Sequence, residues 1–154
     1  MNISKDVQMV GFRVGQEIFG VPISLVHEIV RVPHITAVPE ARRGLEGVIS
    51  LRGKVVPVLD LRKLFGAEDI QANKKNRILV AEIEGKLVGL MVDAASEVLR
   101  LAPDALEPAP DIFDGGAPYV TGVGKLKDRL IITVDLTKVI KAEELEPLFA
   151  TQDA

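Results

Sequence analysis

The two halves of the sequence repeat each other, and this duplication limits the possible folds more than any other feature. Residues 47–61 read GVISLRGKVVPVLDL and align without a gap with residues 122–136, GVGKLKDRLIITVDL. A second block, residues 20–29 (GVPISLVHEI), aligns with residues 89–98 (GLMVDAASEV). A paired Gly, Leu and Asp-Leu in fixed register is hard to obtain by chance. The sequence therefore predicts two units of like topology with a groove between them, which is a natural binding surface.

Short apolar runs rich in Val and Ile fill most of the chain, and Gly, Pro and Asp interrupt them every few residues. This pattern is typical of small antiparallel sheets or barrels. Ten runs predict ten strands, five in each half: residues 7–14, 17–21, 27–32, 46–51, 54–59, 77–84, 86–92, 97–101, 120–126 and 129–135. We expect a mainly all-β fold of two pseudo-repeated five-stranded β-barrels with short helical segments.

The two expected barrels form one domain and cover about residues 15–65 and 77–140. The strand at residues 7–14 and the C-terminal segment 141–154 are expected to pack across the two halves.

Polar and Pro-rich segments separate the expected strands. Residues 66–76 (GAEDIQANKKN) are turn-rich and predict an exposed loop. Residues 102–118 contain four prolines and predict a long crossing loop without regular structure. Residues 143–149 are compatible with a short helix.

Composition argues against several classes of function. The chain has 19 basic and 22 acidic residues, a net charge of -3, whereas a general nucleic-acid binder usually carries a basic excess. The absence of cysteine excludes disulfides and thiolate metal sites, and two histidines are too few for a multi-histidine site. We expect no metal and no cofactor. The longest apolar run, Leu87 to Val92, is too short for a membrane helix, and no targeting segment is visible, so we expect a cytoplasmic protein.

No set of residues predicts a catalytic centre. Asp60 and Asp135 each follow a strand and precede a short helical stretch, where a carboxylate caps the free amides of the first turn. The serines lack a nucleophile motif, and no Gly-rich phosphate loop is present. Arg52 lies in a tight turn with no acid nearby in sequence, so surface decoration and partner contact are both open for it. These observations favour a binding or scaffold module over an enzyme.

Four segments closely resemble the CheW family, the coupling proteins of bacterial chemotaxis arrays. They are residues 47–65 (GVISLRGKVVPVLDLRKLF), 119–140 (YVTGVGKLKDRLIITVDLTKVI), 20–31 (GVPISLVHEIVR) and 87–98 (LVGLMVDAASEV). The resemblance covers nearly the whole chain. One departure is Ser50, where the family often has Asn before the Leu-Arg-Gly triplet.

The resemblance implies a non-catalytic adaptor that couples chemoreceptors to a CheA-type histidine kinase. Its partners would be the regulatory domain of that kinase and the cytoplasmic hairpin tip of the receptor. By the family pattern, Arg52, Val98 and Glu28 are expected to bind the receptor, and Val26 and Gly47 the kinase. A core position is an open alternative for Val98, because its repeat partner is an apolar strand residue. A replacement of Gly47 is expected to disturb either the interface or the fold.

The resemblance leaves the biological output open. The alternative to flagellar chemotaxis is a CheW-like scaffold of a non-flagellar pathway, for surface motility or another output. A CheW-like regulator fused to a phosphoacceptor receiver is a second alternative, but a receiver is a further domain and the chain ends at Ala154. An enzyme with an unrecognised mechanism is a third. We expect a monomer in isolation and rings within membrane-associated arrays, with no nucleic-acid partner and no direct membrane insertion.

Overall fold

The structure is a computed structural model and describes residues 6–41, 44–108 and 119–142. In this part of the chain, strands predominate, and the helical segments are short. The strands are β1 (Val7–Val14), β2 (Glu17–Pro22), β3 (Val26–Arg31), β4 (Leu45–Leu51), β5 (Lys54–Asp60), β6 (Arg77–Ile83), β7 (Lys86–Val92), β8 (Ala94–Leu101), β9 (Leu106–Pro108), β10 (Val120–Leu126) and β11 (Arg129–Val134). The helical segments are η1 (Ile23–Leu25), α1 (Leu61–Leu64), η2 (Pro103–Ala105) and α2 (Leu136–Ala142). The predicted mainly β fold with short helical segments is confirmed.

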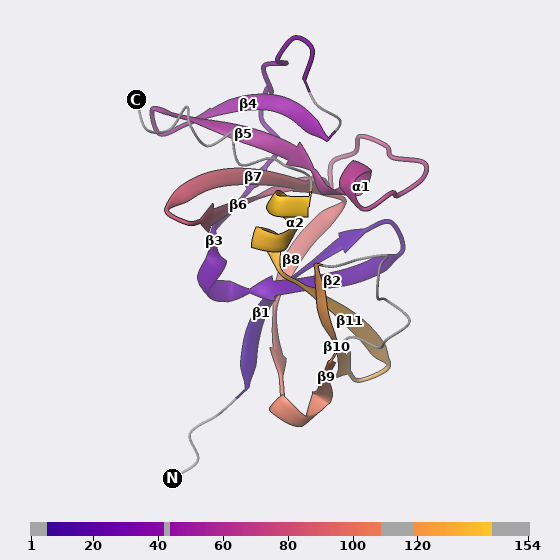
Figure 1. Cartoon of the computed structure of the whole chain (residues 1–154). Coiled ribbons are helices and arrows are strands. Elements are labelled where there is room, and N and C mark those ends of the chain that lie inside the picture. The colour runs from indigo at the N-terminus through magenta and orange to yellow at the C-terminus, as the bar shows by residue number, and fades with distance from the viewer. Residues whose placement is uncertain (1–5, 42–43, 109–118, 143–154) are drawn as a thin grey trace.

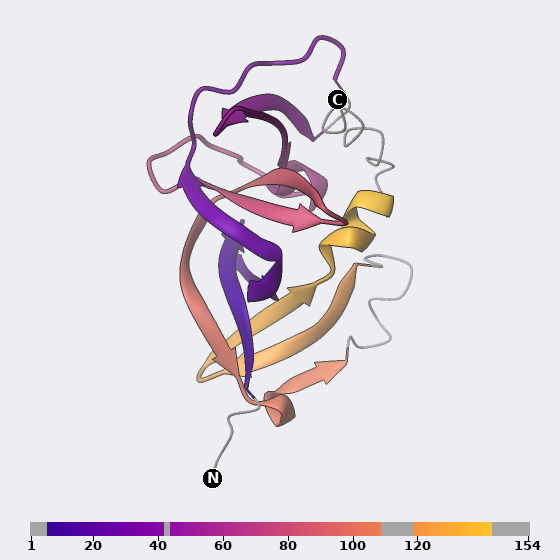
Figure 2. The ribbon, with the colours of Figure 1, turned by 90° about the vertical axis from the view of Figure 1, so that its left-hand side faces the viewer.

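The strands form two sheets that lie one above the other in Figure 1, with α2 between them. The first sheet has the order β8-β1-β2-β11-β10-β9, and the second has the order β3-β6-β7-β5-β4. Figure 2 shows the same two groups of strands from the side. Each sheet contains one parallel pair, β2 with β11 and β5 with β7, and its other pairs are antiparallel.

The two repeats exchange strands. Strands β2 and β3 follow each other in the chain but lie in different sheets, and the same holds for β7 and β8. The two parallel pairs join the repeats in the same register, because Gly20 pairs with Thr133 and Gly89 pairs with Val58. Each sheet therefore contains strands from both halves of the sequence.

This exchange divides the strands differently from the expected barrel ranges of 15–65 and 77–140. The second sheet takes its strands from residues 26–92, whereas the first takes them from residues 7–22 and 94–134. Strand β1 pairs with β2 of its own repeat and with β8 of the other. The alternation of apolar residues shows which residues form strands, but equivalent strands of two repeats carry the same pattern, so it does not show which ones pair.

A short closing segment connects the two edges of each sheet. In the second sheet, Thr36 and Val48 exchange two backbone hydrogen bonds of 2.9 Å and so link the chain after β3 to β4. In the first sheet, Glu107 of β9 pairs with Val123, which is the repeat counterpart of Val48. Strand β9 and η2 lie in the segment 102–118 that was expected to lack regular structure, and that expectation is wrong for residues 103–108. The predicted helix at residues 143–149 lies outside the described residues.

Two apolar clusters stabilise the sheets, and the strands alternate between them. The shared core collects side chains of both sheets and of α2, among them Phe12, Leu79 and Val139. The second core belongs to the second sheet and includes Ile78 and Val80, the neighbours of Leu79 on β6. Since successive side chains of a strand point to opposite faces, β6 is buried on both faces, which explains its nearly continuous apolar sequence.

A row of aromatic rings in the shared core connects the first sheet to the end of α1. Phe12 and Phe19 of the first sheet have ring centroids 5.8 Å apart. Phe65, just after α1, lies 4.9 Å from Phe19 and 5.0 Å from Tyr119. Offset and tilted rings at these distances are favourable contacts beyond the area they bury, so the row fixes α1 against the β1–β2 hairpin.

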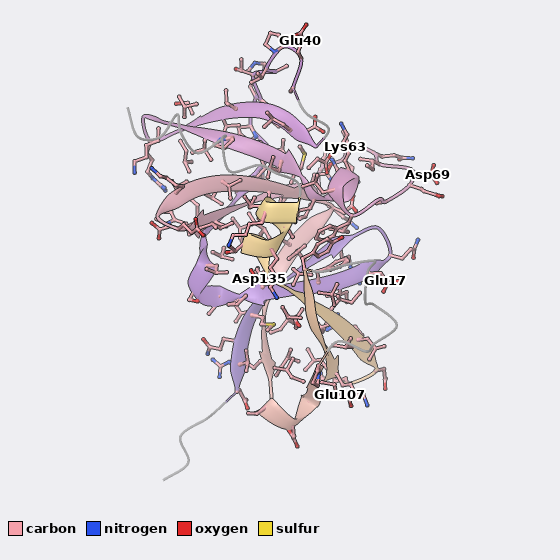
Figure 3. The ribbon with its side chains drawn as sticks, viewed as in Figure 1. Glu17, Glu40, Lys63, Asp69, Glu107 and Asp135 are labelled. Carbon is pink, nitrogen blue, oxygen red and sulfur yellow. The ribbon has the colours of Figure 1, made fainter. Side chains whose placement is uncertain are left out.

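Asp60 and Asp135 cap the two helices, as the sequence predicts. The Asp60 carboxylate accepts a hydrogen bond from the Arg62 amide at 2.9 Å, and Asp135 accepts one from the Thr137 amide at the same distance. Figure 3 labels Asp135 at the start of α2, between the two groups of strands. The two caps differ in one respect. Thr137 is the repeat counterpart of Arg62, and of these two residues only Arg62 carries a charge.

The Arg62 guanidinium is buried and forms a two-point ion pair with the buried Asp60. Its Nε lies 2.9 Å from Oδ1 and its Nη2 lies 3.0 Å from Oδ2 of that carboxylate. Its Nη1 donates to the Gln71 carbonyl at 3.1 Å and to Asp93 Oδ1 at 3.3 Å. Burial lowers the pKa of Arg62, but the hydrogen bonds and negative charges of Asp60 and Asp93 outweigh it and raise the net pKa above its ordinary value.

Asp93 carries the network into the other sheet. Its Oδ2 accepts a hydrogen bond of 2.7 Å from the Gly15 amide at the tip of the β1–β2 hairpin. Its backbone amide donates to the Arg13 carbonyl at 3.0 Å, and its carbonyl accepts from Asn76 Nδ2 at 3.1 Å. The Arg62 network therefore ties α1 and the loop after it to both sheets, although that loop was predicted only to be exposed.

Replacing Arg62 by Met is expected to destabilise the protein by about 3–5 kcal/mol, because Asp60 would then be a buried charge without its partner. The matched control is Lys63→Met on the same helix, where the ion pair with Glu46 is partly exposed and contributes about 1 kcal/mol or less. Urea unfolding of the three proteins measures both changes. Equal stability of the Arg62 and Lys63 variants would contradict the structural role of the network.

Candidate functional site

Arg52 lies at the tip of the β4–β5 hairpin and has a left-handed backbone conformation. Leu51 pairs with Lys54, so Arg52 and Gly53 form a two-residue turn, with φ angles of 50° and 81°. Positive φ at both central positions defines a type I′ turn, which matches the twist of the flanking strands. The Arg52 side chain is 71% exposed.

Arg52 forms an ion pair with Glu28 of β3. Closure of the second sheet brings the two together, since β3 and β4 are its two edges and Thr36 joins them. The sequence analysis found no acid near Arg52, because the two residues are 24 positions apart. The structure thus unites two of the three residues expected to bind the receptor.

Val26 lies at the start of β3 beside a β-bulge. Its neighbour His27 is the extra residue, since Val26 pairs with Ala81 and Glu28 with Val80. A bulge reverses the alternation of faces, so Val26 packs against the shared core and Val30 against the second core. Val26 is half-buried, so its side chain offers a partner only part of its surface.

The contact between Thr36 and β4 that closes the second sheet requires a glycine at position 47. Its φ is 148°, and a Cβ at this position would lie 2.1 Å from the carbonyl oxygen of Thr36. The repeat counterpart Gly122 has the same relation to the other closing segment, with a Cβ position 2.5 Å from the Glu107 carbonyl oxygen. Neither of the two residues expected to bind the kinase therefore presents a freely exposed side chain.

Val98 lies on β8 of the first sheet and is 55% exposed. The core position that was left open for it is wrong. Val98 lines a shallow depression together with Ile23 and Lys127. The third expected receptor residue therefore lies on a different sheet from Arg52 and Glu28.

The repeat relates two exposed sets of side chains, of which the sequence analysis identified only Arg52 and Val98. The Arg52 face consists of Ile29, Arg52 and Val55 on the second sheet, and the Val98 face consists of Val98, Lys127 and Leu130 on the first. In each set the cation has a positive φ, 50° for Arg52 and 56° for Lys127, and each apolar member is exposed. In the sequence, the apolar residues of both sets look like core residues, because they lie in apolar strands. Which of these side chains remain exposed depends on how the strands pair.

Among the residues that the structure describes, no group of three histidine or acidic side chains could hold a metal ion. No helix in the described ranges is long and apolar enough to cross a membrane.

Comparison with known proteins places this geometry in one family. The model of the CheW-like domain matches residues 8–144. The chain is 35% identical to the chemotaxis protein CheW of Rhizobium meliloti over 140 residues, covering 90% of each protein. It is 30% identical to the protein PilI of Pseudomonas aeruginosa over 74% of this chain and 65% of PilI. The crystal structure of the scaffolding protein TtCheW from Thermoanaerobacter tengcongensis matches with a TM-score of 0.82 and 37% identity, covering 88% of this chain and 93% of that one.

Replacing Gly47 by Ala is expected to destabilise the protein by about 3 kcal/mol, because the new methyl group displaces the Thr36 carbonyl and the backbone φ is strained. The control is Gly53→Ala, which has a positive φ but no atom within 4 Å of the new Cβ, and which should cost about 1 kcal/mol. Thermal or urea unfolding separates the two. A Gly47→Ala protein as stable as the Gly53→Ala protein would show that closure by Thr36 is unimportant.

Proposed function

Since the chain belongs to the CheW-like family, we propose that it is a non-catalytic adaptor that couples chemoreceptors to a CheA-type histidine kinase. The observation that carries this proposal is the match over residues 8–144 to the CheW-like domain. The relatives named above support it, because one is a chemotaxis protein and another is a scaffolding protein. In this role the protein would work in the cytoplasm, at receptor arrays associated with the membrane.

The two exposed faces suit a partner that contacts both sheets. The Arg52 face and the Val98 face lie on different sheets, and the shared core and the Arg62 network connect those sheets. Exposed apolar side chains beside a cation are the combination that anchors many protein interfaces. A rigid connection between the sheets would keep a partner on these faces in a fixed relation to a second partner bound elsewhere on the protein.

We assign Arg52, Glu28 and Val98 to receptor contact and Val26 and Gly47 to kinase binding. The ion pair with Glu28 holds the Arg52 guanidinium at the rim of the second sheet, where it can also meet a partner. Gly47 would act on the kinase contact through the closure of the second sheet, and Val26 through its position on the shared core.

A non-flagellar chemosensory pathway is the alternative setting, and it stays open because the matched relatives include PilI as well as chemotaxis proteins. The same adaptor fold would serve either pathway, since what differs is the receptor and the kinase that it joins. Binding measured against each CheA-type kinase of the organism would decide between the two settings. Preference for a kinase that controls surface motility would favour the alternative.

The test of the proposal is capture of the purified protein by two separate baits, a receptor cytoplasmic fragment and a kinase regulatory domain. We expect both to bind. Arg52→Ala should weaken receptor binding about tenfold, as for an interface anchor, and leave kinase binding within about threefold of wild type. Its effect on the stability of the free protein should be about 1 kcal/mol or less, because the side chain is exposed.

Glu84→Ala is the matched control, since Glu84 has a φ of 53° and lies in the β6–β7 turn of the same sheet. It removes a side chain from a left-handed turn position without touching the Arg52 face. Failure of both baits to bind at tens of micromolar would overturn the adaptor. Equal losses for Arg52→Ala and Glu84→Ala would remove Arg52 from the receptor contact.

A further inference from the structure

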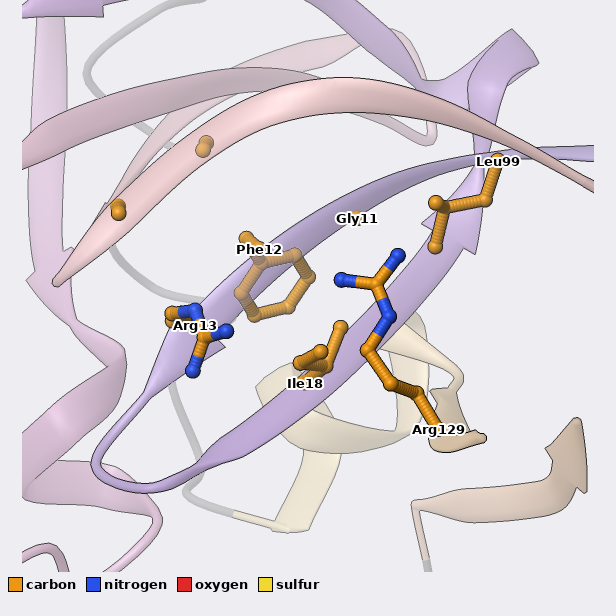
Figure 4. Close-up of a pocket in the computed structure, with 8 residues that line it drawn as sticks. Gly11, Phe12, Arg13, Ile18, Leu99 and Arg129 are labelled. Carbon is orange, nitrogen blue, oxygen red and sulfur yellow. The ribbon is translucent and has the colours of Figure 1, made fainter. Parts of the chain in front are cut away.

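The first sheet has an open depression beside Gly11. Gly11, Ile18 and Leu99 line it, together with Ala94 and Ala95, and its cavity volume is about 100 Å³. Figure 4 shows Gly11 and Phe12 on one strand, with Ile18 and Leu99 on either side. This volume is below the range of about 300–1,000 Å³ that is usual for drug-sized ligands, so the depression has room only for part of a small molecule.

The two repeats pack this region differently. Gly11 pairs with Gly20, and in the other repeat Val80 pairs with Gly89, so Gly11 and Val80 occupy equivalent positions. Val80 is fully buried in the second core. At Gly11 the place of a side chain is taken by Leu99, since a Cβ there would lie 2.7 Å from Leu99 Cδ1. The depression therefore lies beside Leu99, at a position where the other repeat carries Val80.

Two arginines line the depression and give it a positive charge. Arg13 lies on β1 and is exposed, and Arg129 begins β11. Figure 4 shows the Arg129 guanidinium extending towards Gly11 and Phe12. Arg129 has another interaction within the protein, and because a guanidinium carries five N–H donors it can donate to an additional oxygen. None of the other described lining side chains carries a charge.

We propose that this depression binds a carboxylate carried on a short apolar stem. The carboxylate would lie between Arg13 and Arg129, and the stem would contact Ile18, Leu99 and Ala95. Guanidinium groups bind carboxylates with charge-assisted hydrogen bonds, and the apolar walls favour an aliphatic chain over a small inorganic anion.

The test is a titration of the full chain with hexanoate, followed by amide chemical shifts in two-dimensional NMR. We expect saturable shifts confined to the amides around Gly11, Ile18 and Ala95. Hexan-1-ol, which has the same stem without the charge, should bind about tenfold more weakly or not at all. Equal shifts with the alcohol, or hexanoate shifts that do not saturate or spread over the whole chain, would overturn the proposal.

Two variants and a control test the residues. Arg13→Gln should weaken hexanoate binding about tenfold and leave the fold intact, because Arg13 is exposed. Gly11→Val should abolish binding by pushing the Leu99 side chain into the depression. Arg31→Gln removes an exposed arginine of the second sheet and should leave binding unchanged. Unaltered hexanoate affinity in Arg13→Gln would overturn the assignment, even if Gly11→Val failed to fold.

The same carboxylate could belong to a free acid or to an acidic side chain of a docked protein. The receptor fragment and the kinase domain distinguish these sources when each is bound in the presence of saturating hexanoate. Competition with either bait would assign the site to a partner's side chain, and undisturbed binding would assign it to a free acid. Hexanoate binding itself needs neither partner, so its failure is separate from failure of the adaptor function.

Discussion

The buried Arg62 guanidinium is the interaction on which the relation of the two sheets depends. A buried arginine is tolerable only when its charge is paired and its N–H groups find acceptors. Asp60 supplies the two-point pair, and Asp93 extends the network to the Gly15 amide in the other sheet. Because removal of Asp60 or Arg62 would leave the other as a buried charge without its two-point partner, the network holds α1, the loop after it and the β1–β2 hairpin in one arrangement. The aromatic row through Phe19 and Phe65 reinforces the same contact with apolar packing.

The exchange of strands makes the two sheets a single folding unit. Since each sheet draws strands from both repeats and the largest apolar cluster belongs to both, neither repeat could bury its apolar faces alone. The Arg52 face and the Val98 face are consequently connected by a continuous core. For the proposed adaptor this connection matters, because a receptor that contacts both faces would keep a defined position relative to a kinase bound through Val26 and Gly47. The duplicated fold thus provides two related surfaces on one rigid body.

Small differences between the repeats give the two sheets different properties. Gly47 and Gly122 are equivalent and serve the same closure, so the constraint on them is shared. Arg62 and Thr137 are equivalent, but only one of them forms a buried ionic network. Gly11 and Val80 are equivalent, but Val80 fills its own core position, whereas at Gly11 the Leu99 side chain takes that place. Features that the repeats share explain the fold, and features in which they differ are where specific functions can be sought.

The sequence by itself determined ten of the eleven described strands, the duplication, the caps at Asp60 and Asp135 and the CheW-like family, because all of these depend on local patterns. Alternation of apolar residues marks strands, and a carboxylate before a helical stretch marks a cap. The tertiary structure alone decided which strands pair, and with that the exchange between sheets, the exposure of Val98 and the meeting of Arg52 with Glu28. These depend on contacts between residues far apart in the chain, and two repeats with equivalent strand patterns leave the choice of partner open. Only the packed sheets resolve it, because one arrangement buries the shared core and satisfies Arg62 together.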